Sequence, residues 1–175
     1  MNRLTIILLL LLLSSIQVHA QIFMGNAGEI LFFSEAPMED ISAVNNKVSA
    51  VFDSSTRDLV FQLKISDFIF PKALMQEHFN ENYLESDIYP NSTFSGKVVQ
   101  NKNGKAIVNG DLTIHGKTNK IRLSGVLIQN QESIIISAEF EIKLEDYNIK
   151  IPRIVMYKIA EEIEIKVNIE LKEVK

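Results

Sequence analysis

The feature that most constrains this chain is a regular alternation of apolar and polar residues over long segments. Between Ile134 and Leu144 every even-numbered residue is apolar, while most odd-numbered residues are polar. The same alternation runs from Ile163 to Leu171, where glutamate, lysine and asparagine occupy the intervening positions. Successive side chains of a β-strand point to opposite faces. Each segment therefore predicts a strand with one apolar and one polar face.

The complete pattern predicts about eight strands separated by short polar links. The predicted strands cover residues 28–34, 46–53, 57–67, 92–100, 105–115, 119–129, 133–145 and 162–173. The segment "HGKTNK", residues 115–120, predicts the connection of one hairpin. The segments "FDSSTRD" and "QNQES", residues 52–58 and 129–133, predict two further loops.

Antiparallel strands that each have one apolar face must close into a barrel or stack as two sheets. Several predicted strands reach ten residues, which is long compared with the usual strand of about five or six. The predicted fold class is therefore all-β, an extended eight-stranded antiparallel barrel with one or two short helices. The alternation leaves the interior undecided, because a small barrel either fills with side chains or holds one small ligand.

Two segments interrupt the alternation. In residues 72–86, Met75, Phe79 and Leu84 recur at roughly helical spacing, which predicts a short helix that closes one barrel end or forms its rim. The polar residues of this segment are expected to face water: Gln76, Glu77, Asn80, Glu81 and Asn82. Residues 152–163 predict a second short helix or an irregular loop, and the proline at its start suits a first helical turn.

The N-terminus predicts a secretory signal over residues 1–20. Arg3 precedes an apolar run from Leu4 to Leu13, and small or modest residues precede Gln21. The run is shorter than the roughly 20 apolar residues of a spanning helix. We therefore expect a periplasmic or secreted domain, residues 21–175, that is not stably inserted in a membrane. Without residues 1–20 the formal charge changes from −4 to −5, which argues against nucleic acid and anionic membrane surfaces as partners.

Catalytic and metal-binding patterns are absent from the sequence. There is no cysteine, so thiol chemistry, cysteine metal sites and disulfides are excluded. His78 and His115 are the histidines that follow the signal, and their spacing matches no known zinc motif. No Gly-x-Ser-x-Gly elbow is present. We therefore expect neither an enzyme nor a cofactor, and His115 is expected to be a solvated turn residue.

Three segments resemble successive signatures of the YceI-like family. They are "YPNSTFSGKV" (89–98), "GDLTIHGKTNKIRL" (110–123) and "FEIKLEDYNIKIP" (140–152), and they occur in the family's order. The resemblance implies an exported, lipocalin-like eight-stranded barrel that binds polyisoprenoid lipids. The first strands lack the Arg-x-Gly-x-Phe segment of many members, and His78-Phe79 stands where a His-Leu pair is usual. The chain thus looks like a short variant, and the exact ligand is not implied.

The resemblance implies that a polyisoprenoid or similar long-chain amphiphile occupies the barrel lumen. The residues expected to contact it are the large apolar residues of the inner faces and two residues of the helical segment: Phe61, Leu63, Phe94, Leu112, Ile114, Leu123, Ile136, Phe140, Phe79 and Tyr83. Tyr83 suits the mouth, because its ring is apolar and its hydroxyl polar. Small inward residues could leave the lumen open or pack it: Ala50, Ala106, Gly110, Gly125 and Ala138. The alternative is a filled barrel that acts as a structural or protein-interaction module, and a homodimer stays open.

Overall fold

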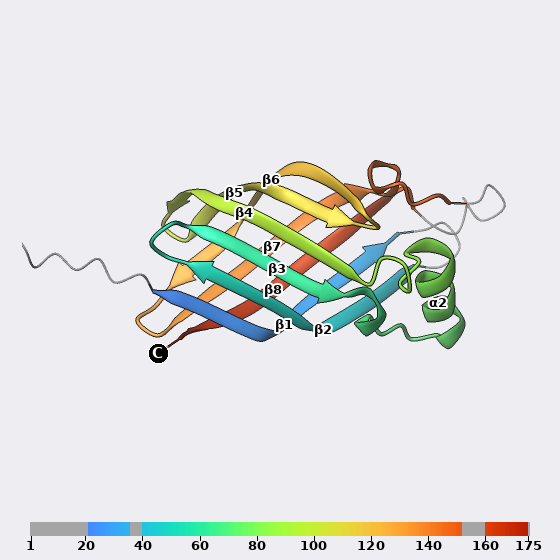
Figure 1. The fold of residues 1–175 in the computed structure, drawn as a ribbon, viewed down its shortest axis with the longest axis horizontal. Helices are drawn as coiled ribbons and strands as arrows, with labels where there is room; N and C mark the ends of the chain where they lie inside the picture. Colours follow the sequence, from blue (N-terminus) through green and yellow to red (C-terminus); the bar gives the residue numbers. More distant parts are fainter. Residues whose placement is uncertain (1–20, 36–39, 152–159, 175) are drawn as a thin grey trace, which may run out of the picture.

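The protein is a closed eight-stranded antiparallel barrel in the computed structural model, which describes residues 21–35, 40–151 and 160–174 (Figure 1). Each strand pairs with its neighbour in sequence, and β8 returns to pair with β1. The strands are β1 (Ile22–Ser34), β2 (Ile41–Asp53), β3 (Asp58–Lys64), β4 (Asn91–Lys102), β5 (Lys105–Ile114), β6 (Lys117–Gln129), β7 (Ser133–Lys143) and β8 (Glu162–Glu173). The predicted fold class is confirmed.

The first three strands differ most from the predicted ranges. β1 starts six residues earlier than predicted, at Ile22, and the pairing of β1 with β2 shifts on both sides of Gly28. Such bulges break the alternation, which is why the sequence pattern misses this part of the strand. β2 includes the fully buried Asn45, whose side-chain amide donates to the Lys64 carbonyl oxygen at 2.9 Å. β3 ends at Lys64, because the chain turns into the short 3-10 segment η2 (Ile65–Asp67).

The β5–β6 hairpin turns within two residues and not over the whole predicted link. His115 and Gly116 both have positive φ, 50° and 71°, as a two-residue type I′ turn requires. Residues 117–120 consequently belong to β6, and Thr113 pairs with Thr118 across the hairpin. A Cβ on Gly116 would also lie 2.5 Å from Cε1 of Tyr89. Glycine is therefore required at this position both by the backbone and by the neighbouring ring.

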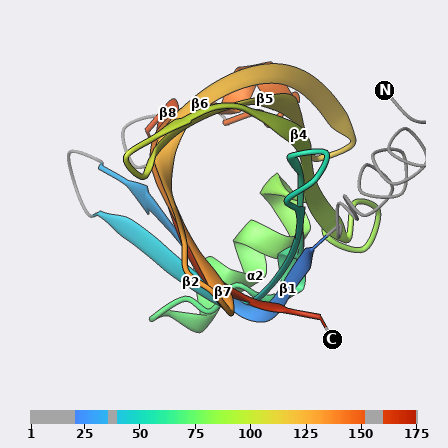
Figure 2. The ribbon, with the colours of Figure 1, turned by 90° about the vertical axis from the view of Figure 1, so that its left-hand side faces the viewer.

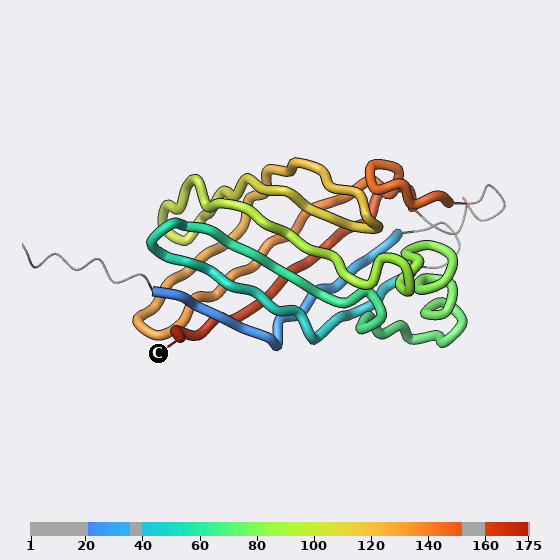
Figure 3. The backbone as a smooth tube through the Cα atoms, in the orientation of Figure 1, coloured from blue at the N-terminus to red at the C-terminus, as the bar shows by residue number. Residues whose placement is uncertain are grey.

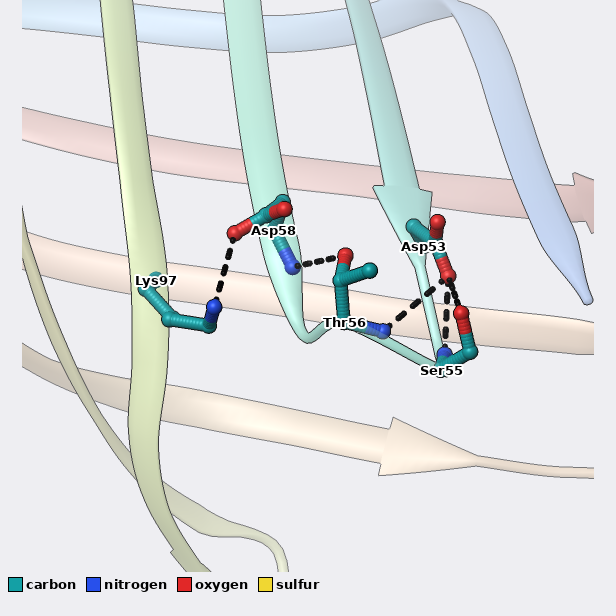
Figure 4. A network of polar contacts seen from close by, with 5 residues as sticks. All are labelled: Asp53, Ser55, Thr56, Asp58 and Lys97. Carbon is teal, nitrogen blue, oxygen red and sulfur yellow. Dashed lines mark hydrogen bonds and ion pairs between the residues drawn. The ribbon is translucent and has the colours of Figure 1, made fainter. Parts of the chain in front are cut away.

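The β2–β3 turn is held by its own polar side chains (Figure 4). The Asp53 carboxylate accepts hydrogen bonds from the backbone N–H of Ser55 at 2.8 Å and of Thr56 at 3.2 Å. The Ser55 hydroxyl also donates to it, at 2.6 Å, and these bonds lower the pKa of Asp53. Lys97 of β4 lies 3.5 Å from the Asp58 carboxylate. The turn thus fixes the pairing register at this end of the barrel.

The interior divides along the barrel axis into two clusters of buried apolar residues. The first, which we call the filled half, comprises Phe23, Ala50, Phe52, Leu59, Val98, Ala106, Leu127, Ile134, Ile136, Ile169 and Leu171. The second, the hollow half, has buried members Ile30, Ala43, Val48, Leu63, Ile65, Phe68, Phe70, Leu84, Phe94, Leu112, Tyr147 and Ile149. Many further apolar side chains of the hollow half keep accessible surface, whereas Phe61 and Val108 are the partly buried residues packed against the filled half.

The helical segment lies across the end of the hollow half. It consists of α2 (Ala73–His78) followed by a single π-helical turn, η3 (Phe79–Tyr83). Viewed along the barrel, α2 is framed by the strands at the far end (Figure 2). The start of β1 and the end of β8 lie at the opposite end (Figure 3), where the Val174 N–H donates to the Ile22 carbonyl oxygen at 2.8 Å. The second predicted helical segment falls mainly on residues 152–159, outside the described residues.

Candidate functional site

A cavity of about 190 Å³ lies inside the hollow half. Side chains from all eight strands line it, together with residues of η2, η3 and of η4 (Leu144–Tyr147). Toward the filled half the cavity ends on Leu59, Ala106, Leu127 and Ile136, which belong to both the lining and the filled cluster. The space is therefore a blind bore, closed at its inner end by packed side chains.

Nine of the ten residues predicted to contact a ligand line this cavity. They are Phe61, Leu63, Phe79, Phe94, Leu112, Ile114, Leu123, Ile136 and Phe140. The tenth, Tyr83, packs against the hollow-half cluster but is not among the lining residues. Of the small inward residues, Ala106, Gly125 and Ala138 belong to the lining. The structure therefore brings the predicted apolar set together around a single space.

Sequence reasoning missed lining residues of two kinds. Ile121, Ile142 and Ile165 follow the alternation of strands that were predicted, so a complete reading of the inner faces would have included them. Phe68 and Ile149 lie just beyond strand ends, where the chain leaves the sheet and the alternation stops. Only the three-dimensional path of these segments brings them over the bore.

The ring of Phe94 lies along the barrel wall above two glycines. Gly96 and Gly110 pair with each other across β4 and β5. A Cβ atom built on Gly96 or Gly110 would lie 2.5 Å or 2.6 Å from Cζ of Phe94. Side chains at these positions would push the ring away from the wall. The two glycines therefore help to keep the bore open.

Four phenylalanine rings close the helical end of the bore. Phe79 of η3 stacks on Phe32 with ring centroids 5.7 Å apart, and it contacts Phe70 at 4.9 Å and Phe68 at 5.5 Å. Phe32 also meets Phe68 and Phe70 edge-on at 6.2 Å and 5.6 Å. Aromatic rings at such distances and angles attract each other beyond their area burial. We call these four residues the aromatic lid.

Two residues that were expected to face water are instead partly buried. The side chain of Gln76 accepts a hydrogen bond from the backbone N–H of Phe70, with N and Oε1 3.4 Å apart. Asn80 is half-buried, and its Oδ1 atom is buried without a hydrogen-bond partner among the described residues. The helical segment thus packs more than one side onto the barrel, because it lies in the opening and not along the outer wall.

His115 connects the barrel rim to the helical segment, so the expectation of a solvated turn residue was wrong. Its side chain is 10% exposed, and its Nε2 atom lies 2.7 Å from Oε2 of Glu85. Its Nδ1 atom lies 3.2 Å from the carbonyl oxygen of Tyr147 in η4, and the Tyr89 ring packs edge-on against the imidazole. These contacts, which we call the rim clasp, hold three segments of the hollow end together.

Two tyrosines at the hollow end of the barrel have raised pKa values. Burial raises the pKa of the Tyr83 hydroxyl. Burial also raises the pKa of Tyr147, which is 3% exposed, against an opposing effect of its hydrogen bond with Asn119. Removing water from a phenol disfavours its anion. Both hydroxyls are therefore harder to ionise than those of exposed tyrosines.

Among the described residues, the cavity lining includes no charged side chain. Its polar residues are Gln62, Ser92, Thr93, Ser124 and Ser137, and the Ser92 hydroxyl already donates to the Thr113 carbonyl oxygen at 2.8 Å. In the part of the chain that the structure describes, no three or more acidic or histidine side chains gather as a metal site. Nor is any helix among the described residues long and apolar enough to span a membrane. The geometry suits an apolar ligand.

Comparison with known proteins gives one family and several similar structures. A model described as the YceI-like domain matches residues 21–171. No curated protein matches the chain. BcnA of Burkholderia cenocepacia has a similar structure, with 18% identity and a TM-score of 0.73 over 82% of this chain and 95% of that one.

Two further solved structures share the fold. A polyisoprenoid binding domain from Saccharophagus degradans, implicated in plant cell wall breakdown, has a TM-score of 0.75 at 10% identity. The match covers 89% of this chain and all of that chain. The YceI protein of Campylobacter jejuni has a TM-score of 0.65 at 20% identity, covering 81% and 89%. At such identities the similarity establishes a common fold.

Proposed function

Because this chain belongs to the YceI-like family and has an apolar bore, we propose that it is a binding protein for a polyisoprenoid or similar long-chain amphiphile. We further propose that it is exported by residues 1–20, is periplasmic or secreted, and stores or transports its lipid without chemical turnover. The observation that carries the proposal is the lining of the bore, which comes from all eight strands and, in the part of the chain that the structure describes, holds no charged side chain.

The size of the bore limits how the ligand is held. At about 190 Å³ it exceeds the roughly 150 Å³ cavity that accommodates benzene in an engineered protein, but it falls below the usual ligand pocket of about 300–1,000 Å³. Only part of a long chain fits without movement of side chains. Each methylene that enters gains about 0.8 kcal/mol from leaving water, so a few isoprene units suffice for stable binding. The remainder of the ligand lies outside the bore.

A matched pair of substitutions tests the proposal. Val108 lines the cavity, and its cross-strand partner Val98 is buried in the filled half. Val108→Phe fills the bore and should weaken binding of geranylgeraniol, a 20-carbon polyisoprenoid alcohol, at least tenfold while stability changes by less than about 1 kcal/mol. Val98→Phe overpacks the filled half and should cost about 1–3 kcal/mol without a comparable loss of affinity.

Binding is measured by native mass spectrometry and by titration with the alcohol. If wild-type protein binds no geranylgeraniol and carries no lipid from a membrane rich in isoprenoids, the lipid-binding proposal fails. Equal affinity of wild type and Val108→Phe would show that the ligand lies elsewhere.

A protein-interaction role is the second candidate, and one surface feature favours it. Ile128 and Ile135 face each other across β6 and β7 on the outside of the barrel, at 45% and 39% exposure. A neighbouring apolar residue, Val126, is also exposed. Ile128→Lys should convert a dimer to a monomer in sedimentation experiments if this patch pairs two copies. The lipid affinity should not change in that variant.

A further inference from the structure

The barrel wall is incomplete between β6 and β7. These strands pair from Gln129↔Ile134 to Gly125↔Ala138, and the ladder stops there. Residues 117–124 of β6 and 139–143 of β7 are paired on their other sides, with β5 and β8 respectively. In each of the ladders β4–β5, β5–β6 and β7–β8 the pairing continues over the full shared length. We call the unpaired region the β6–β7 slot.

Apolar lining residues stand on both edges of the slot. If the register of the ladder continued, Leu123 would oppose Phe140, and Ile121 would oppose Ile142. All four line the cavity and keep accessible surface. The side chains on both edges of the slot therefore also belong to the apolar lining of the bore.

The slot has a defined length. Its inner end is the Gly125↔Ala138 pair, where neither residue has a side chain large enough to obstruct the passage. At its outer end η4 spans the two strands, since the Asn119 side-chain amide donates to the Asp146 carbonyl oxygen at 2.7 Å. The seven residues from Asn119 to Gly125 span about 20 Å of strand. An extended hydrocarbon chain can pass sideways through an opening of this length.

A second gap in the wall, between β2 and β3, is bridged by neighbouring residues. Those strands pair only over Ser49–Asp53 and Asp58–Gln62. Beyond that point Val44 pairs with Ile69 through two backbone hydrogen bonds of 2.8 Å and 3.2 Å. The Asn45 side chain also bonds the Lys64 carbonyl oxygen. Among the described residues, the filled half packs against the inner end of the cavity, and the aromatic lid and the rim clasp lie across its other end.

We propose that the β6–β7 slot is the passage by which the lipid tail enters the bore. The polar head group then stays on the outer surface of the barrel, beside the slot. This inference rests on the proposed lipid-binding function. No charged residue within 21–35, 40–151 or 160–174 lines the bore to receive a head group, whereas Lys120, Arg122 and Glu141 are exposed along the two edges. A ligand with a slim apolar tail and one polar end fits this passage.

Cross-linking across the slot tests the route in a chain that has no cysteine of its own. Arg122→Cys with Glu141→Cys places two thiols on exposed, opposite edges of the slot. Asn109→Cys with Arg122→Cys is the matched control, because these residues are already paired in the β5–β6 ladder. Each folded double variant is joined with thiol-reactive cross-linkers of graded length that contain a reducible disulfide, and the cross-linked fraction is purified.

The probe is geranylgeraniol with a fluorescent anthraniloyl ester at its alcohol end, and its uptake is followed by stopped-flow fluorescence. Cross-linking the slot with the shortest linker that reacts should slow uptake and release at least tenfold, and reduction should restore both rates. Cross-linking the control pair should change them less than twofold. Uptake at an unchanged rate through a bridged slot overturns the inference. If the protein without cross-links binds no probe, the proposed function itself fails.

Discussion

The two halves of the barrel use the same alternating strands but have different interiors. In the filled half, Phe23, Ile134 and Leu171 have no accessible surface at all. In the hollow half, side chains of the same kind on the same strands, such as Ile142 and Ile165, remain partly accessible around a cavity. The difference shows that the apolar pattern defines the barrel wall, whereas the way opposite side chains meet decides whether the centre is solid.

The position of aromatic residues accounts for part of this difference. Phe23 and Phe52 reach into the filled half, whereas four rings of the hollow half gather in the aromatic lid at its end. Phe94 lies over its two glycines at the wall. Apart from Phe61 and Phe140, the rest of the hollow half is lined largely by isoleucine, leucine and valine, whose side chains are shorter.

The largest predicted effect comes from shortening one isoleucine side chain in each half. Ile134→Ala removes buried contacts from close packing and should lower the free energy of unfolding by about 2–5 kcal/mol. Ile142→Ala removes side-chain atoms that already face the cavity, so the loss should be about 1 kcal/mol, because fewer contacts disappear. Urea denaturation of the ligand-free protein measures both values. Equal losses of unfolding free energy would mean that the hollow half is packed without a cavity in solution.

A smaller effect is expected at the rim clasp. His115→Asn keeps a residue that accepts positive φ and creates the preferred type I′ sequence before Gly116, but it removes the contacts to Glu85 and Tyr147. Stability should fall by about 1 kcal/mol, and amide hydrogens of η3 should exchange faster than in the wild type. Ser55→Ala, in the turn at the filled end, is the control and should leave exchange in η3 unchanged. Unaltered η3 exchange in His115→Asn would show that the clasp does not hold the helical segment.

The smallest effect is a pH dependence of the hollow end. Burial raises the pKa of Tyr83 and Tyr147 above the ordinary value near 10. Below about pH 10 both tyrosines are protonated in the folded and in the unfolded chain, and their contribution to stability is fully present. As the pH rises further, the unfolded chain releases protons that the folded chain retains, so the free energy of unfolding falls. Replacing both residues by phenylalanine should flatten the decline above about pH 10. An identical decline in wild type and double variant, measured by urea denaturation, would assign it to other groups.

The sequence predicted the features that depend on short-range periodicity. Alternation located all eight strands but left open which face of each points inward, and helical spacing located α2 and η3. The YceI-like motifs pointed to the family and to a lipid as ligand. The early starts of β1 and β2 were missed, because the bulges at Gly25 and Gly28 and the buried Asn45 disrupt the period of two residues.

Other features depend on contacts between distant residues and have no local signal. The contact of His115 with Glu85 joins residues 30 positions apart, and nothing in a turn sequence distinguishes a bonded histidine from a solvated one. The choice between a filled and a hollow lumen depends on side chains of opposite walls. The end of the β6–β7 ladder is likewise a property of barrel geometry, because β6 and β7 alternate without interruption on both sides of it.

The unpaired strand edges of the slot also affect the tendency of the protein to aggregate at high concentration. Exposed backbone edges readily recruit strands of other molecules, and charged outward side chains are a common protection against such aggregation. Here Lys120, Arg122, Glu141 and Lys143 occupy the outward positions beside the two edges. An incoming strand would have to desolvate these charges before it could form hydrogen bonds. The charges beside the slot should therefore discourage fibre growth from its unpaired edges.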